Sequence, residues 1–113
     1  MGVSLTLVVN AFVKDDNLPL AYERLLTDRD YDMQDSIRNC GVVEFRQGRK
    51  LHWYDDEGLE DTDKDNYGDR LTSTRAKLIA DAMAKYKLSP KNRAVMEYMK
   101  ALPPDTEIFL WWH

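Results

Sequence analysis

The clearest apolar pattern lies at the two ends of the chain, and both ends predict β-strands. Residues 3–12 are mostly apolar or β-branched, as are residues 106–112. On an extended chain the first segment has two faces, one with Leu5, Leu7 and Val9 and the other with Thr6, Val8 and Phe12. In the second segment, Ile108, Leu110 and Trp112 alternate with Glu107, Phe109 and Trp111. Apolar residues on both faces are typical of interior strands, so we expect the two segments to be neighbours at the centre of a sheet.

Helical spacing appears in four segments. Residues 18–26 predict a short helix with Pro19 in its first turn, after a turn at residues 14–17. Asp30 or Asp28 would cap a second helix that precedes Gly41. Thr72 or Ser73 would cap a third, and Ser89-Pro90 would begin a fourth that ends before Pro103. The apolar stripes of the last three helices would be Met33, Ile37 and Cys40; Leu78, Ile79, Ala82, Met83 and Tyr86; and Val95, Tyr98, Met99 and Leu102.

A β-hairpin is predicted in the middle of the chain, from residues 42–45 and 50–54. A three-residue loop, Gln47-Gly48-Arg49, would pair Phe45 with Leu51 and bury that face. The opposite face would then carry Val42, Glu44, Arg46, Lys50, His52 and Tyr54.

These elements predict one α+β domain over residues 1–113. The length of 113 residues, with 43% apolar and 32% charged residues, fits a single globular core. We expect a sheet of about four strands, mostly antiparallel, with helices packed on one face. Such a sheet leaves its other face available for binding.

Charge is divided unevenly along the chain, although the formal net charge is only −4. Between residues 55 and 69 there are eight acidic residues and one base, a predicted acidic loop on a mildly basic body. The negative balance argues against a general nucleic-acid binder. The loop is either a solvated surface or a contact for a basic partner, and the partner-binding candidates there are Asp55, Asp56, Glu57, Glu60, Asp61, Asp63 and Asp65.

Motifs for catalysis, metals and cofactors are not evident. No G-x-S-x-G turn or glycine-rich phosphate loop occurs, and Cys40 is the single cysteine. The acids of residues 61–65 resemble the start of a calcium loop, but Asn66 and Thr72 replace the required glycine and glutamate. We therefore expect no enzyme activity, no metal and no cofactor. Without a membrane-spanning run or a secretory leader, a cytoplasmic location is expected.

The most suggestive segment for ligand binding is the predicted hairpin. Cations alternate there with aromatic rings, a mixture that suits a small anionic nucleotide because guanidinium groups hold phosphates and rings stack on bases. An ordinary hairpin, with Trp53 in the core, is the alternative. The ligand-binding candidates are Arg46, Arg49, Lys50, His52 and Tyr54, with Arg70 and Arg75 from the predicted start of the third helix.

Two tryptophans, Trp111 and Trp112, lie in the last predicted strand. They either fill the core or contact a second copy of the chain, which would make a homo-oligomer.

Two stretches resemble small accessory proteins of tailed bacteriophages: residues 28–32 (Asp-Arg-Asp-Tyr-Asp), and residues 92–106 from Asn-Arg-Ala-Val to Leu-Pro-Pro-Asp-Thr. The resemblance implies a phage protein that acts in the host cytoplasm against a bacterial defence. Our leading hypothesis is a non-enzymatic anti-defence protein that sequesters a small nucleotide signal. The alternatives are an acidic inhibitor that binds a host nucleic-acid-handling or defence protein through residues 55–69, and a small structural or assembly protein.

Overall fold

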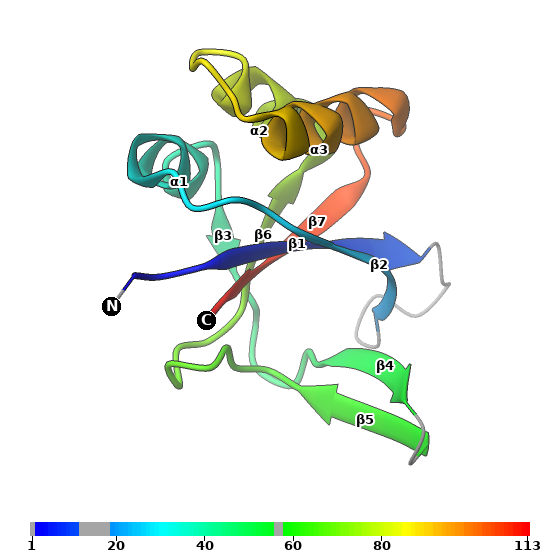
Figure 1. Cartoon of the computed structure of the whole chain (residues 1–113). Helices are drawn as coiled ribbons and strands as arrows, with labels where there is room; N and C mark the ends of the chain where they lie inside the picture. Colours follow the sequence, from blue (N-terminus) through cyan, green and yellow to red (C-terminus); the bar gives the residue numbers. More distant parts are fainter. Residues whose placement is uncertain (1, 12–18, 56–57) are drawn as a thin grey trace.

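The computed structural model describes residues 2–11, 19–55 and 58–113, with side chains omitted at 11, 54, 55, 58 and 59. Its elements are β1 (Leu5–Ala11), β2 (Leu20–Leu26), α1 (Tyr31–Arg38), β3 (Val43–Glu44), β4 (Leu51–Asp55), β5 (Gly58–Thr62), β6 (Thr72–Arg75), α2 (Ala76–Met83), α3 (Pro90–Ala101) and β7 (Glu107–Trp112). They form one α+β domain around a single curled sheet (Figure 1). Phe12 and the turn predicted at residues 14–17 lie outside the described residues.

The first and last strands lie side by side at the centre of the sheet, as predicted. The strand order is β3-β6-β7-β1-β2-β4-β5, and β1 is antiparallel to both of its neighbours. Leu7 is opposite Leu110 on one side and Leu25 on the other. The described part of the sheet has seven strands, not about four, and the pairing of β2 with β4 is parallel.

All three helices cover the same face of the sheet (Figure 1). Leu5, Leu7 and Val9 of β1 point to this face, and Ile108 and Leu110 of β7 lie beside them. The buried helical residues that complete this main core are Met33, Ile37, Ala76, Ile79, Ala80, Ala82, Met83, Val95, Met96 and Met99. Seven of the predicted stripe residues are buried in this core: Met33, Ile37, Ile79, Ala82, Met83, Val95 and Met99. Four are partly buried against it (Cys40, Tyr86, Tyr98 and Leu102), and Leu78 is 39% exposed.

Two of the predicted helix starts are confirmed in detail. Asp30 caps α1 by accepting a hydrogen bond from the backbone N–H of Met33, and Ser89 caps α3 in the same way from Asn92. Gly41, which follows α1, has a φ of 75°, in the left-handed region that glycine adopts without strain.

The helix predicted over residues 18–26 is wrong: residues 20–26 form β2. Ala21 and Glu23 are opposite consecutive residues of β1, so Tyr22 is an extra residue in the strand, a β-bulge. The bulge interrupts the alternation of faces, and Ala21 packs below the sheet whereas Leu25 packs against the helices. The sequence therefore lacks the period of two that would have indicated a strand.

The predicted hairpin is also wrong. β3 pairs with β6, whereas β4 pairs with β5, which comes from the first half of the predicted acidic loop. Aspartate and glutamate are poor strand formers, so residues 58–62 resembled a loop. β4 nevertheless provides a strongly β-forming partner, and His52 lies opposite Asp61 across the pair.

The third predicted helix begins later in the chain than the sequence indicates. Thr72 to Arg75 form β6, whose Thr74 hydroxyl donates a hydrogen bond to the backbone carbonyl of Cys40. α2 begins at Ala76 with Arg75 as its N-cap, and no side chain caps it. Threonine and serine suit both caps and strands, and here the pairing with β7 decides the outcome.

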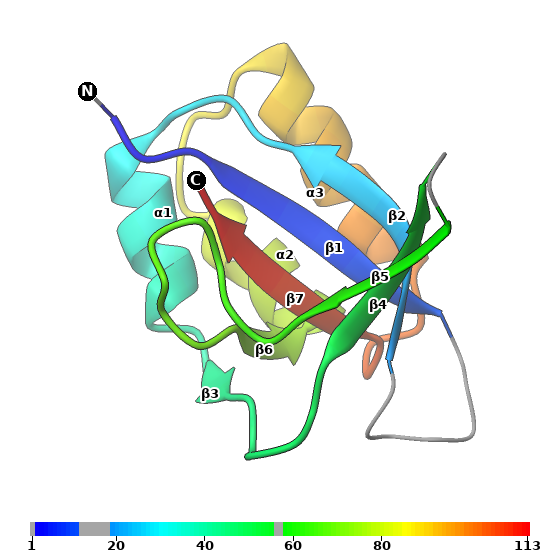
Figure 2. The same cartoon turned by 90° about the horizontal axis from the view of Figure 1, so that it is seen from below.

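The second face of the sheet is partly covered by its own end strands. Figures 1 and 2 show β4 and β5 folded across this face, opposite the helices. A small second core lies between, and its buried residues are Val8, Phe45, Leu51, Leu71 and Phe109. Phe45 and Phe109 meet edge to face, with ring centroids 5.3 Å apart.

Candidate functional site

A pocket of about 260 Å³ opens beside this second core. We call it the tryptophan pocket, and it is lined by Thr6, Val8, Ala21, Arg24, Leu51, Trp53, Asn66, Trp111 and His113. Among the residues that the structure describes, no acidic side chain lines it. Apolar and aromatic walls with a few convergent polar groups are typical of small-molecule sites, and the volume lies just below the roughly 300–1,000 Å³ of most ligand pockets.

The register of the strands determines which side chains of the sheet line the tryptophan pocket. Thr6 lies opposite Trp111, and Val8 lies opposite both Phe109 and Arg24, so all these side chains are on the second face. Trp53 comes from β4, which folds across that face. Its ring meets Trp111 edge to face, with centroids 6.1 Å apart and planes at 80°. Two indoles from strands far apart in the chain therefore form adjacent walls.

Polar groups stand at the edges of the tryptophan pocket. The guanidinium of Arg24 lies over the ring of Trp53, 5.6 Å from its centroid. A hydrogen bond of 2.8 Å joins the Thr6 hydroxyl to Nε2 of His113. The side chain of Asn66 adds an amide. The described lining thus offers ring faces, the guanidinium of Arg24 and several other hydrogen-bonding groups.

An ion pair fixes the chain just before β4. Arg49 is only 6% exposed and donates two hydrogen bonds, of 2.6 and 2.5 Å, to the carboxylate of Glu107. The hydroxyl of Ser73 and the amide of Asn10 donate to the same carboxylate. The guanidinium also lies over the ring of Phe45, 4.7 Å from its centroid. This network anchors the segment that carries Trp53.

The predicted ligand-binding residues are distributed over several places. Arg46, Arg49 and Arg75 line one hollow of about 270 Å³, together with Glu44 and Glu107. Arg75 donates to the backbone carbonyl of Asp105. Among the described pockets, this hollow brings together the largest number of the predicted ligand-binding residues. Its two carboxylates offset much of the positive charge of the three arginines.

The remaining four predicted ligands lie elsewhere. Arg70 forms an ion pair with Glu44 at 3.7 Å and donates to the carbonyl of Phe45. His52 lies 3.8 Å from Asp61. Lys50 is exposed, and the side chain of Tyr54 lies outside the described residues.

The predicted partner surface is partly built into the fold. Glu60 and Asp61 are exposed on β5, which is an edge strand, whereas Asp63 and Asp65 are half-buried. Asp56, Glu57 and the side chain of Asp55 lie outside the described residues. Both terminal tryptophans are half-buried: Trp112 packs against the main core and Trp111 against the second core.

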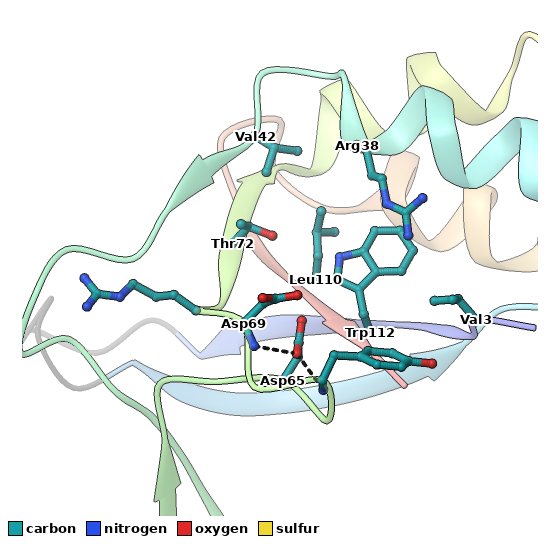
Figure 3. Close-up of a pocket in the computed structure, with 10 residues that line it drawn as sticks. Val3, Arg38, Val42, Asp65, Asp69, Thr72, Leu110 and Trp112 are labelled. Carbon is teal, nitrogen blue, oxygen red and sulfur yellow. Dashed lines mark hydrogen bonds between the residues drawn. The ribbon is translucent and has the colours of Figure 1, made fainter.

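A second pocket, of about 410 Å³, is lined by Leu110 and Trp112, which lie on the helix-covered face, and by Asp65, Tyr67 and Asp69 (Figure 3). The guanidinium of Arg38 stacks over Trp112, 4.0 Å from the ring centroid, and pairs with Asp35. The carboxylate of Asp65 accepts hydrogen bonds from the backbone N–H groups of Tyr67 and Asp69. Figure 3 shows the carboxylates of Asp65 and Asp69 close to the centre of this pocket, and Arg38 and Arg70 also line it, so its lining carries charges of both signs.

Sequence reasoning missed Arg24 and Thr6 as site residues and placed Trp53 in the core. Arg24 follows the bulge in a segment predicted to be helical, so its position beside Trp53 had no signal in the sequence. The alternation of Thr6 with Leu5 and Leu7 did place it on the second face of the sheet, which was the available clue.

Comparison with models of protein families found no match, and neither did comparison with curated proteins or with solved structures. Among the described residues, no group of three or more histidine, cysteine or acidic side chains is arranged to hold a metal ion. None of the described helices is both long and apolar enough to span a bilayer.

Proposed function

We propose that this protein is a non-enzymatic binding protein that holds a small anionic nucleotide in the tryptophan pocket. One observation carries the proposal: Trp53, Trp111 and Arg24 come from three different strands and meet in a pocket whose described lining residues include no acid. A base stacked on an aromatic ring gains about 1–3 kcal/mol, and a guanidinium is the preferred partner of a phosphate.

The pocket geometry favours stacking on one indole instead of a sandwich between two. The planes of Trp53 and Trp111 are nearly perpendicular, so a base on the face of one ring meets the edge of the other. Thr6, Asn66 and His113 supply hydrogen-bonding groups to the edge of the base. Tight binding without turnover would suit a protein that withdraws a nucleotide signal from a host defence in the bacterial cytoplasm, as the phage resemblance implies.

A ligand screen tests this proposal. Thermal unfolding is measured with nucleoside monophosphates, cyclic di- and trinucleotides and ADP-ribose, each with the wild-type chain. A ligand at 100 times its dissociation constant stabilises the fold by about 2.7 kcal/mol, which is readily detected as a rise in Tm. We expect at least one nucleotide to raise the Tm and to quench tryptophan fluorescence.

Two variants localise the effect. Trp53→Leu removes one wall of the tryptophan pocket and should abolish most of the Tm rise. Tyr22→Leu is the matched control, because Tyr22 is an aromatic residue of β2 that is 71% exposed and outside the pocket. No Tm rise with any of these nucleotides, or an equal loss in both variants, would refute the proposal.

A further inference from the structure

Arg24 differs in its contacts from three other arginines that line pockets. Arg38, Arg49 and Arg70 each form an ion pair with a carboxylate. Among the residues that the structure describes, no carboxylate lies within ion-pair distance of Arg24, and its guanidinium contacts the face of Trp53. An exposed guanidinium on an indole is a weak contact that a better partner can replace.

The backbone of Arg24 is held in the sheet, whereas its guanidinium group can move. The residue lies in β2 opposite Val8, so its side chain leaves the sheet on the side of the tryptophan pocket. The side chain is exposed, and its long stem lets the guanidinium move between the ring and the rim of the pocket. The ring face that it covers is the flat apolar surface on which a base would stack.

We propose that Arg24 occupies the place of a base on Trp53 and moves to the phosphate when a mononucleotide binds. This inference rests on the proposed function and narrows it to nucleotides with a single base and a phosphate near it. The base takes the face of Trp53, and the released guanidinium forms a bidentate contact with the phosphate.

Pocket size and charge support a mononucleotide over a cyclic dinucleotide. The volume of about 260 Å³ accommodates one base with its sugar, and the lining offers one guanidinium. Arg24 is therefore the residue that distinguishes a nucleotide from the corresponding nucleoside.

Calorimetric titration with AMP and with adenosine tests this role in the full chain. Wild-type protein should bind AMP at least about tenfold more tightly than adenosine, because a charge-assisted pair of hydrogen bonds is added. In Arg24→Gln the preference should fall to within about twofold, and adenosine should bind as well as before or better, since the face of Trp53 is freed. Arg24→Lys should restore part of the preference, because it keeps the charge and loses the fork.

Arg93→Gln is the matched control, since Arg93 is an exposed arginine of α3 on the helix-covered side of the sheet. It should leave both affinities unchanged. If both ligands bind but Arg24→Gln weakens them equally, or if wild-type protein does not prefer AMP, the role of Arg24 is refuted while the proposed function stands. If neither ligand binds and no nucleotide of the screen binds, the proposed function itself fails.

Discussion

The two faces of the sheet differ in how many residues they bury and in which residue types they carry. The helix-covered face buries fifteen residues of the described chain in one continuous core, whereas the other face buries five and then opens into the tryptophan pocket. Aliphatic residues, alanines and methionines fill the first face. The second combines aliphatic residues with the rings of Phe45 and Phe109, and its pocket adds two tryptophans and an arginine. Most of the buried apolar residues therefore lie on the helix-covered side, and the binding that we propose is on the other side.

A core truncation gives the largest effect that this comparison predicts. Ile79 of α2 is fully buried in the main core, so Ile79→Ala should lower the free energy of unfolding by about 4 kcal/mol, through lost burial and a cavity. Leu78→Ala is the neighbouring control and should cost about 1 kcal/mol, because Leu78 is 39% exposed. Urea denaturation measures both. Equal losses in the two variants would contradict the arrangement of α2.

The next largest effect is expected on the second face. Arg49→Met leaves the carboxylate of Glu107 without its guanidinium partner, and we expect a loss of about 3 kcal/mol. Lys50→Met, an exposed neighbour, should change stability little. Adding Glu107→Gln to Arg49→Met should recover part of the loss, because an unpaired amide is less costly to bury than an unpaired carboxylate. A double variant no more stable than Arg49→Met would show that the ion pair does not hold this segment.

The pH dependence of thiol alkylation measures how far the helix-covered side shields Cys40 from solvent. Cys40 is half-buried against the main core, and burial raises the pKa of its thiol, although the Thr74 hydroxyl opposes the shift. Because the thiolate is the reactive form, a raised pKa means less of it at a given pH. We expect iodoacetamide to react with Cys40 several-fold more slowly at pH 8 than with a free cysteine, and the midpoint of the rate profile to lie at higher pH. A midpoint at the free-thiol value would contradict this burial.

The smallest predicted effect separates the two candidate anion sites of the second face. Arg46→Gln with Arg75→Gln removes two cations from the hollow that also holds Glu44 and Glu107. If the tryptophan pocket binds the nucleotide, the affinity measured by titration should change by less than about twofold, because distant surface charges are screened. A loss of tenfold or more would instead place the ligand at the residues that the sequence indicated.

What the sequence could predict differs between the two faces. The central strands, the capped helices α1 and α3 and the apolar stripes follow from local periodicity, so the helix-covered face was largely predictable. The second face depends on a bulge at Tyr22, on an acidic segment that becomes β5 and on the crossing of β4 beneath the sheet. These features arise from contacts between distant segments, and local patterns do not contain them. The tryptophan pocket could therefore not be assembled from the sequence.

The most direct test of the tryptophan pocket follows the indole N–H signals of the three tryptophans by ¹⁵N NMR during addition of AMP. Trp53 and Trp111 line this pocket, whereas Trp112 lines the second pocket, of about 410 Å³. We predict that the signals of Trp53 and Trp111 shift together in a saturable manner while that of Trp112 stays in place. A shift confined to Trp112, or no shift of any indole with AMP although AMP raises the Tm in the ligand screen, would contradict our central claim.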